Sequence, residues 1–117
     1  MTGTVKYSYD QLVQYARNAG FSNGDEYTAA AIALAESGGN PHAYNPENAA
    51  NAPAGQGSFG LWQVFLHAHP EFFGHALYDP QVNANDAFAI YQEARSFNPW
   101  STFKSGAYLQ YLPSEQS

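Results

Sequence analysis

Apolar residues recur at helical spacing in three stretches of the chain, and this pattern predicts a mostly α-helical domain. The first predicted helix begins at a capping box, with Ser8 as N-cap and Gln11 at the third position, and ends near Gly20. The second begins at Asn23, a predicted N-cap, and continues through alanine and leucine to Glu36. Because its side chains are small, other helices can approach it closely, so we expect it to be the buried central element.

The third predicted helix has the clearest beginning, because Asp79 is a favourable N-cap and Pro80 occupies the first helical position. We expect it to end near Ser96. Shorter helices are predicted for residues 59–65, 100–104 and 106–112, and a broken helix for residues 70–77. The helix at 100–104 follows a cap residue and a proline at 98–99. Residues 114–117 are predicted to be a tail. The length fits one domain, 1–117, with a core of about 8–112.

Residues 38–58 lack periodicity and contain four glycines and three prolines, so we expect an irregular segment. A stretch of this length without regular structure inside a compact domain is usually functional or disordered. It lies between the two most informative motifs of the chain. We therefore expect it to line a site, with room for a small β element.

Composition excludes several classes of protein. The net charge is −6 with only four basic residues, so nucleic-acid binding, which needs a basic surface, is not expected. There is no cysteine and hence no disulfide, and no apolar run is long enough to span a membrane. Residues 1–20 lack the pattern of a signal peptide. The chain is therefore expected to stay in the cytosol, to be delivered by another machine, or to be excised from something larger.

Glu36 lies at the predicted end of the second helix, just before a Gly-Gly pair. The partial negative charge of a helix C-terminus disfavours an anion there, and apolar neighbours disfavour it further. Both effects raise the pKa of this carboxyl group, which suits general acid catalysis. The structural alternative is a solvated glutamate that merely precedes a helix cap.

A second motif covers residues 57–64 and combines glycine, uncharged polar groups and an aromatic ring. Gly57 and Gly60 permit close approach of the backbone. Ser58 and Gln63 offer donors and acceptors without charge, and Trp62 offers a flat face. This mixture suits a sugar, whose hydroxyl groups take hydrogen bonds and whose C–H faces stack on aromatic rings. The alternative is a serine N-cap before a short helix with core aromatics.

The two motifs together resemble those of soluble lytic transglycosylases. Residues 36–43, Glu-Ser-Gly-Gly-Asn-Pro-His-Ala, resemble the Glu-Ser motif that opens the catalytic domain. Residues 58–64, Ser-Phe-Gly-Leu-Trp-Gln-Val, resemble the family's Ser-x-Gly-Leu-Met-Gln motif, with Trp62 in the methionine place. The helix that begins Asp-Pro-x-x-Asn at 79–83 is similar to the family's next helix, so the resemblance covers roughly 8–112. The Trp-x-x-Phe pattern at 100–103 is closer to phage-tail and actinobacterial versions.

The resemblance implies a lysozyme-like single domain that cleaves peptidoglycan between N-acetylmuramic acid and N-acetylglucosamine, without a cofactor. Glu36 would be the single catalytic acid and base. Substrate-binding residues would be Ser37, Ser58, Trp62, Gln63, Tyr91 and Trp100. The family's later Ala-Tyr-Asn motif is absent in that form, and Tyr91, Trp100 and Tyr108 are candidates for its aromatic role.

The sequence does not decide between two possible reaction products. If the sugar's own 6-hydroxyl attacks, a 1,6-anhydro product forms and the enzyme is a lytic transglycosylase; if water attacks, it is a lysozyme. A second carboxylate that holds a water would favour hydrolysis, and Glu47 is the nearest candidate, although we interpret it as a solvated loop residue. A rival of another class is a non-catalytic glycan-binding or structural module of a virion or cell envelope. A third is a helical interaction domain that binds no sugar.

The histidines do not predict a metal site. His67 and His69 would point to different faces of a helix, and no cysteine or carboxylate triad lies nearby in the sequence. We interpret them, with His75, as surface or capping residues. The expected partner is therefore the glycan strand of peptidoglycan. The expected place of action is the cell wall, where the chain would act as part of a virion or envelope assembly, or as a secreted or excised domain.

Overall fold

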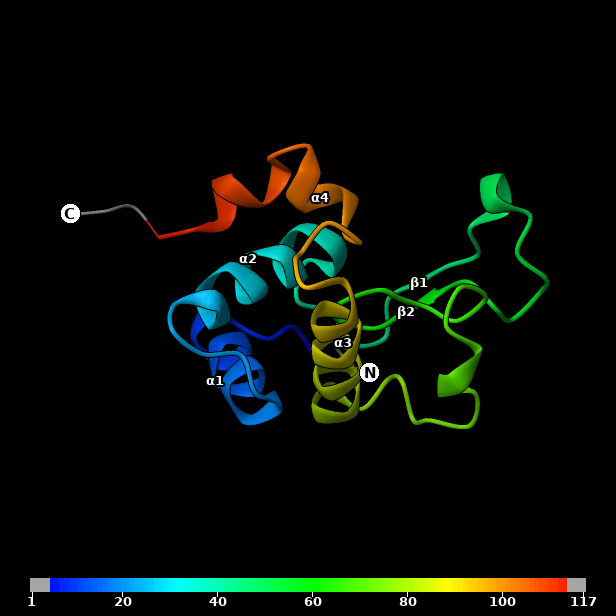
Figure 1. Cartoon of the computed structure of the whole chain (residues 1–117), viewed down its shortest axis with the longest axis horizontal. Helices are drawn as coiled ribbons and strands as arrows, with labels where there is room; N and C mark the ends of the chain where they lie inside the picture. The colour runs from blue at the N-terminus through cyan, green and yellow to red at the C-terminus, as the bar shows by residue number, and fades with distance from the viewer. Residues whose placement is uncertain (1–4, 114–117) are drawn as a thin grey trace.

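Helix α2 (Asp25–Ser37) lies at the centre of the computed structural model, which describes residues 5–113. Helix α1 (Tyr9–Ala19) packs against α2 and against α3 (Pro80–Ala94), and the later helices cover α2 from the other side (Figure 1). Residues 29–33 of α2 have no exposed surface, so every face of that part of the helix is covered. The predicted mostly α fold and the central place of the second helix are confirmed.

The ends of α1 and α3 follow the predicted capping signals. The Ser8 side chain accepts the backbone N–H of Gln11, and the Gln11 side chain accepts the N–H of Ser8, which completes the capping box. The Asp79 carboxylate accepts two backbone N–H groups at the start of α3, at 2.9 and 3.0 Å. The helix ends at Ala94, one or two residues before the predicted position, where Arg95 takes a left-handed conformation with φ 59°.

The predicted N-cap of α2 is wrong by one residue. Gly24 is the N-cap, and Asn23 precedes it in a left-handed conformation with φ 58° and makes no capping bond. Instead, the Glu26 carboxylate accepts the N–H of Gly24 at 2.9 Å. The same carboxylate receives the Arg17 guanidinium at 3.2 Å, so this helix start is also tied to α1.

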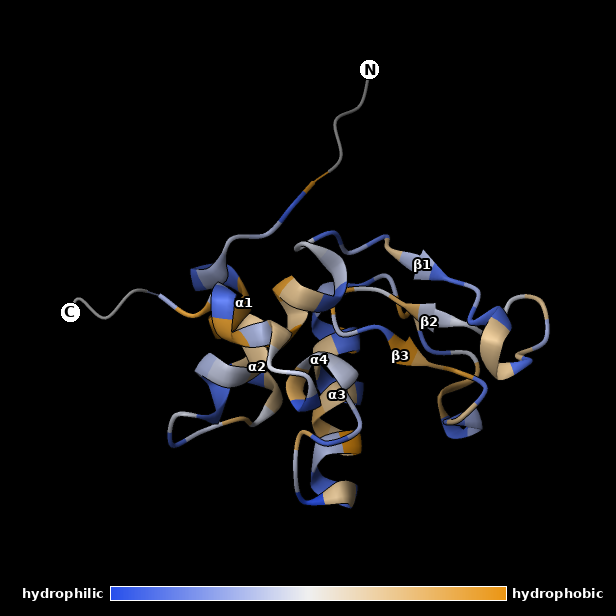
Figure 2. Ribbon diagram, turned by 90° about the horizontal axis from the view of Figure 1, so that it is seen from above, coloured by the Kyte–Doolittle hydropathy of each residue, from blue (hydrophilic) through white to orange (hydrophobic). Residues whose placement is uncertain are grey.

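A small antiparallel sheet stands beside the helices and contains β1 (Tyr44–Asn45), β2 (Ser58–Phe59) and β3 (Val64–Phe65) in that order. Figure 2 shows the three strands side by side, with β3 the most hydrophobic. The helix predicted for 59–65 is therefore wrong, because β2 and β3 form a hairpin with a turn at 60–63.

The hairpin turn depends on two residues in left-handed conformations. Gly60 has φ 77° and Gln63 has φ 49°, values that do not continue a helix. A side chain at Gly60 would also place its Cβ 2.4 Å from the amide nitrogen of Asn83, which leaves no space for one. The segment 38–58, predicted to be irregular with room for a small β element, contains β1 and the start of β2. The sheet continues beyond that segment, to the end of β3 at Phe65.

The shorter elements differ in extent from their predictions. Only Pro70–Phe72 of the broken helix is helical, as a 3₁₀ turn. The residues after it are tied to α3 by His75, whose Nδ1 lies 2.8 Å from Oδ2 of Asp86. Helix α4 (Ser101–Lys104) begins one residue late, with Trp100 rather than Asn98 as its N-cap. Two further 3₁₀ turns are present at Asn48–Ala50 and Ala107–Tyr111. The predicted tail at 114–117 lies outside the described residues.

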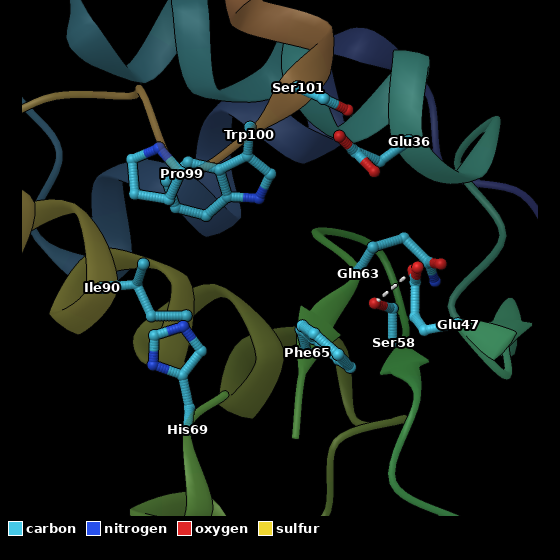
Figure 3. A pocket seen from close by; sticks show the side chains of 10 residues that line it. All are labelled: Glu36, Glu47, Ser58, Gln63, Phe65, His69, Ile90, Pro99, Trp100 and Ser101. Carbon is cyan, nitrogen blue, oxygen red and sulfur yellow. Dashed lines mark hydrogen bonds between the residues drawn. The ribbon is translucent and has the colours of Figure 1, made fainter. Parts of the chain in front are cut away.

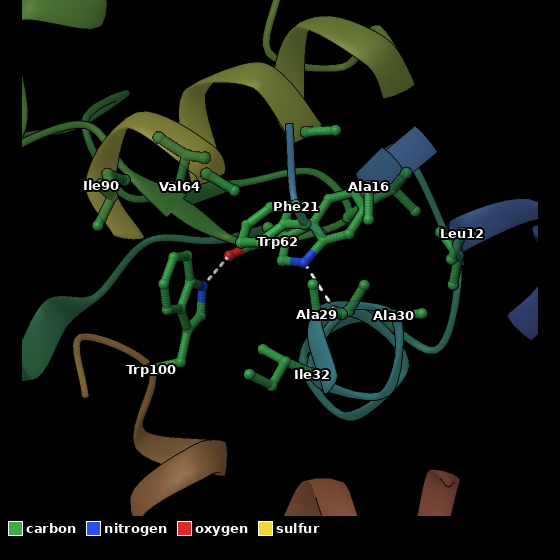
Figure 4. Close-up of a cluster of buried hydrophobic side chains, with 14 of the residues drawn as sticks. Leu12, Ala16, Phe21, Ala29, Ala30, Ile32, Trp62, Val64, Ile90 and Trp100 are labelled. Carbon is green, nitrogen blue, oxygen red and sulfur yellow. Dashed lines mark hydrogen bonds between the residues drawn. The ribbon is translucent and has the colours of Figure 1, made fainter. Parts of the chain in front are cut away.

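Trp62 is buried in the core rather than exposed along a groove, which corrects the expectation from its motif. Only 1% of its surface is exposed, and its ring extends from the hairpin turn towards α2 (Figure 4). Its indole Nε1 donates to the carbonyl of Ala29 at 2.9 Å, and its own carbonyl accepts Nε1 of Trp100 at 2.8 Å. The hairpin turn directs this ring inward, so Trp62 joins the turn to α2 and to the segment before α4.

Asn83 on α3 fixes the hairpin from the other side. Its Oδ1 accepts the N–H of Trp62 at 2.8 Å, and its Nδ2 donates to the carbonyls of Phe59 and Leu77 at 2.8 and 2.9 Å. The side chain is completely buried, so each of these backbone groups would lack water if the bond were lost. None of the helices in residues 5–113 is long and apolar enough to cross a bilayer.

Replacing Asn83 by alanine is expected to lower the free energy of unfolding by at least ~3 kcal/mol, because three buried backbone groups lose their partner. Urea unfolding at neutral pH measures the difference. Asn85→Ala, on the exposed face of the same helix, is the control and should change stability by less than ~0.5 kcal/mol. Equal midpoints for the two variants would show that the Asn83 bonds do not hold the hairpin.

Candidate active site

A cleft of about 220 Å³ lies where the end of α2 faces the small sheet (Figure 3). One side, which we call the helical side, is formed by the end of α2 and by residues 99–101. The opposite side, the sheet side, is formed by the hairpin and by the segment between β1 and β2. The residues that line the cleft are Glu36, Glu47, Ser58, Gln63, Phe65, His69, Ile90, Pro99, Trp100 and Ser101.

Glu36 is the penultimate residue of α2, and its carboxyl group points into the cleft from the helical side (Figure 3). The helix ends immediately afterwards, because Gly38 takes a left-handed conformation with φ 65°. The hydroxyl of Thr102 on α4 donates to Oε2 of Glu36 at 2.9 Å. Thr102 lies 66 residues further along the chain, and no local sequence signal indicated this contact.

Burial raises the pKa of the Glu36 carboxyl group, because a partly desolvated carboxylate is less stable than its neutral form. The hydrogen bonds from Thr102 oppose this effect and lower the pKa, while the nearby charge of Glu47 raises it further. The balance leaves the pKa above its ordinary value, so the proton is retained to higher pH than on a solvated glutamate. The raised pKa expected from the sequence therefore has burial as its main cause.

Glu47 lines the cleft from the sheet side, which corrects its interpretation as a solvated loop residue. The hydroxyl of Ser58 donates to Oε2 of Glu47 at 2.8 Å. The backbone of Glu47 is also held, because its N–H donates to Oδ1 of Asn45 at 3.1 Å. The cleft thus contains two carboxyl groups on opposite sides, and the second belongs to Glu47, the nearest candidate that the sequence offered.

Gln63 and Trp100 lie at the cleft as the sequence analysis expected, although hydrogen bonds already restrict both. Nε2 of Gln63 donates to the carbonyls of Ala43 and Gly60, at 3.2 and 3.0 Å. Its amide therefore has its oxygen left for a ligand. Trp100 is 5% exposed and its indole N–H is bonded to Trp62, so what it can offer a ligand is the surface of the ring.

Two predicted substrate-binding residues lie away from the cleft. The Ser37 hydroxyl donates to the carbonyl of Ala33 at 2.8 Å and accepts the N–H of Gly39, so it stabilises the end of α2. Tyr91 is on a side of α3 where its ring packs against Phe21 and its hydroxyl donates to Asp25. The polar groups of both side chains are bonded within the protein, and neither residue, nor Trp62, lines the cleft.

Two of the histidines each have a single carboxylate neighbour. Within residues 5–113, no group of three or more histidine, aspartate or glutamate side chains is arranged to hold a metal ion. His69 lines the cleft, which the sequence did not indicate, and its Nδ1 lies 3.6 Å from the Glu71 carboxylate. His75 is paired with Asp86 on α3, where it holds the preceding turns in place.

Comparison with known protein families matches the chain to the model of an SLT-type lysozyme-like domain over residues 13–102. The chain belongs to this lysozyme-like domain family. The match includes Glu36, Glu47, Ser58, Gln63 and Trp100, and so covers the cleft. No curated protein and no solved structure matches the chain. At the level of the family, the lysozyme-like domain has a peptidoglycan-related glycosidase or transglycosylase role.

Replacing Glu36 by glutamine is expected to stabilise this lysozyme-like domain at neutral pH. Because its pKa is raised, Glu36 binds its proton more tightly in the folded chain, so stability falls as pH rises from the ordinary glutamate pKa through the raised one. Glutamine does not titrate and avoids this loss. Thermal unfolding across a pH series measures the effect. The melting temperature of the variant should exceed that of the wild type by an amount that grows as pH rises and disappears below about pH 4. Parallel curves would contradict the raised pKa.

Replacing Thr102 by valine is expected to raise the pKa of Glu36 further, because the carboxylate loses the hydroxyl that donates to it. An NMR titration of the Glu36 side-chain carbonyl carbon measures this pKa directly. Thr102→Ser keeps the hydroxyl and is the matched control. A pKa that is unchanged or lower in the valine variant would show that the hydrogen bond does not act on the ionised form.

Proposed function

We propose that this lysozyme-like domain cleaves the β-1,4 bond between N-acetylmuramic acid and N-acetylglucosamine in peptidoglycan, with Glu36 as the general acid. The observation that carries the proposal is the Glu36 carboxyl group, partly buried at the end of α2 and facing a polar cleft. Its raised pKa supports the role, because a general acid must keep its proton near the pH at which it works.

The first chemical step requires only one carboxyl group. Protonated Glu36 donates its proton to the glycosidic oxygen as the bond from the muramic acid C1 breaks. The substrate's own N-acetyl group can stabilise the positive charge that develops at C1. Glu36 is then ionised, and its hydrogen bond from Thr102 stabilises that ionised form.

The nature of the attacking group decides between two reactions. Attack by the 6-hydroxyl of the same sugar gives the 1,6-anhydro product of a lytic transglycosylase, which needs no group beyond Glu36. Attack by water gives the reducing end produced by a muramidase. The likeness of the two sequence motifs to lytic transglycosylases favours the first reaction, while Glu47 in the cleft is a specific observation that favours the second.

We also propose which groups hold the glycan. The Gln63 amide oxygen can accept a hydroxyl or N-acetyl N–H, and the surface of the Trp100 ring can contact a sugar C–H face. Phe65, Ile90 and Pro99 supply apolar contact along the same cleft. Ser58 acts through Glu47, to which its hydroxyl is bonded.

The proposed place of action is the cell wall. With a net charge of −6, the domain gains no long-range attraction to anionic wall polymers. We therefore propose that a larger virion or envelope assembly, or secretion, brings it to its substrate. No cofactor enters the proposed reaction.

Glu36→Gln is expected to leave the fold and chitooligosaccharide binding intact and to reduce the release of soluble fragments from purified sacculi at least ~100-fold. Glutamine keeps the size of the side chain but cannot donate a proton to the glycosidic oxygen. Mass analysis of the released fragments measures the loss. If the variant releases fragments as fast as the wild type, Glu36 is not the general acid. A wild-type protein that binds the sugar but releases nothing would instead be a non-catalytic module, and one that binds no saccharide an interaction domain.

A further inference from the structure

We infer that Glu47 is a second catalytic carboxylate, which activates water opposite Glu36 and makes the domain a hydrolase that inverts the anomeric centre. This inference rests on the proposed function, because it concerns the group that attacks C1 in the same reaction; water attacks directly, in place of assistance by the substrate's N-acetyl group. It departs from the single-carboxylate scheme that the sequence motifs imply. Three features of the structure support it, namely the position of Glu47, the way it is held, and its effect on Glu36.

The first feature is position. Glu36 enters the cleft from the helical side, next to Ser101, and Glu47 enters from the sheet side, next to Ser58 (Figure 3). A sugar ring between the two sides would have one carboxyl group near each face. Inverting glycosidases use this arrangement, in which one carboxyl group protonates the leaving oxygen and the other directs water to the opposite face.

The second feature is that Glu47 is held on both its backbone and its side chain. Its backbone is left-handed, with φ 55°, a conformation that costs a residue with a side chain on the order of 1 kcal/mol. The bonds from the Glu47 N–H to Asn45 and from Ser58 to Oε2 keep the side chain at the cleft in spite of this cost. Ser58 is itself 3% exposed and lies in β2, paired with both β1 and β3.

The third feature is the electrostatic coupling between the two groups. Burial is the main cause of the raised pKa of Glu36, and the nearby charge of Glu47 adds to it in the same direction. A general acid with a raised pKa beside a second carboxyl group is an arrangement that suits acid and base catalysis in one site. The Ser58 hydroxyl donates to Oε2 of Glu47 and so fixes the direction in which that side chain enters the cleft.

The reaction then balances with the glycan and one water molecule as its only reactants. Glu36 gives its proton to the glycosidic oxygen, and the bond between the muramic acid C1 and that oxygen breaks. The oxygen of a water molecule bonds to C1 from the other face while Glu47 takes one of its protons. The products are a free 4-hydroxyl on one sugar and a reducing end on the other. The proton on Glu47 returns to Glu36 through solvent in the open cleft.

The test is product analysis of the wild-type protein with purified sacculi in water labelled with heavy oxygen. We expect each new muramic acid end to carry one labelled oxygen, and NMR of a soluble glycan digest to show the α-anomer first. Unlabelled 1,6-anhydro ends would overturn the inference but leave the proposed cleavage standing. A β-anomer first would also overturn it. Failure to release any fragment would overturn the proposed function itself, and this inference with it.

Two variants test Glu47 directly. Glu47→Gln should reduce the formation of labelled reducing ends at least ~100-fold, with 1,6-anhydro ends as the residual product. Glu47→Ala should recover turnover with added azide, which needs no base, and should then give an α-glycosyl azide. The control is Asp10→Asn, at an exposed carboxylate of α1 outside the cleft lining. If Glu47→Gln forms labelled ends within two-fold of the control, or azide has no effect on the alanine variant, Glu47 is not the base.

Discussion

The three hydrogen bonds of Trp62 hold together the parts of the chain that form the cleft. Its N–H is bound by Asn83 on α3, its indole nitrogen by Ala29 on α2, and its carbonyl by Trp100 before α4. A buried polar group without a partner costs about 1–3 kcal/mol, so the ring is fully buried only in an arrangement that satisfies all three. That arrangement sets the hairpin, and hence the sheet side of the cleft, relative to the helix that carries Glu36.

The same contacts explain why the two carboxyl groups differ in their surroundings. Glu36 is on a helix whose middle is enclosed on every face, and its end is covered by α4, so the carboxyl group is partly removed from water. Glu47 is on a segment that solvent reaches, and its charge is held by a serine hydroxyl. With only four basic residues in the chain, these carboxyl groups are kept in place by hydroxyl donors, since neither makes an ion pair within the described residues.

Local signals in the sequence were sufficient for the three long helices and for the place of Glu36 at the end of the second one. Capping residues such as Ser8 and Asp79 act within one helical turn, so their effect can be predicted without knowing the fold. The hairpin was missed because strands of two residues show no alternation, and its turn is defined by the backbone of Gly60 and Gln63. Thr102 and Glu47 were missed or misjudged because their roles come from contacts between distant segments, which periodicity does not report.

The segment between β1 and β2 contributes nothing to the core, since no residue in 46–56 is buried. Residues 46–56 can therefore drift, lengthen or shorten with little penalty to stability, while α2 and Glu36 stay unchanged. Glu47 is on this tolerant segment. In evolutionary terms, a lineage could gain or lose the proposed water-activating carboxylate by exchanging one surface loop, and so alter the chemical end of the fragment that we propose the domain releases, without rebuilding the fold.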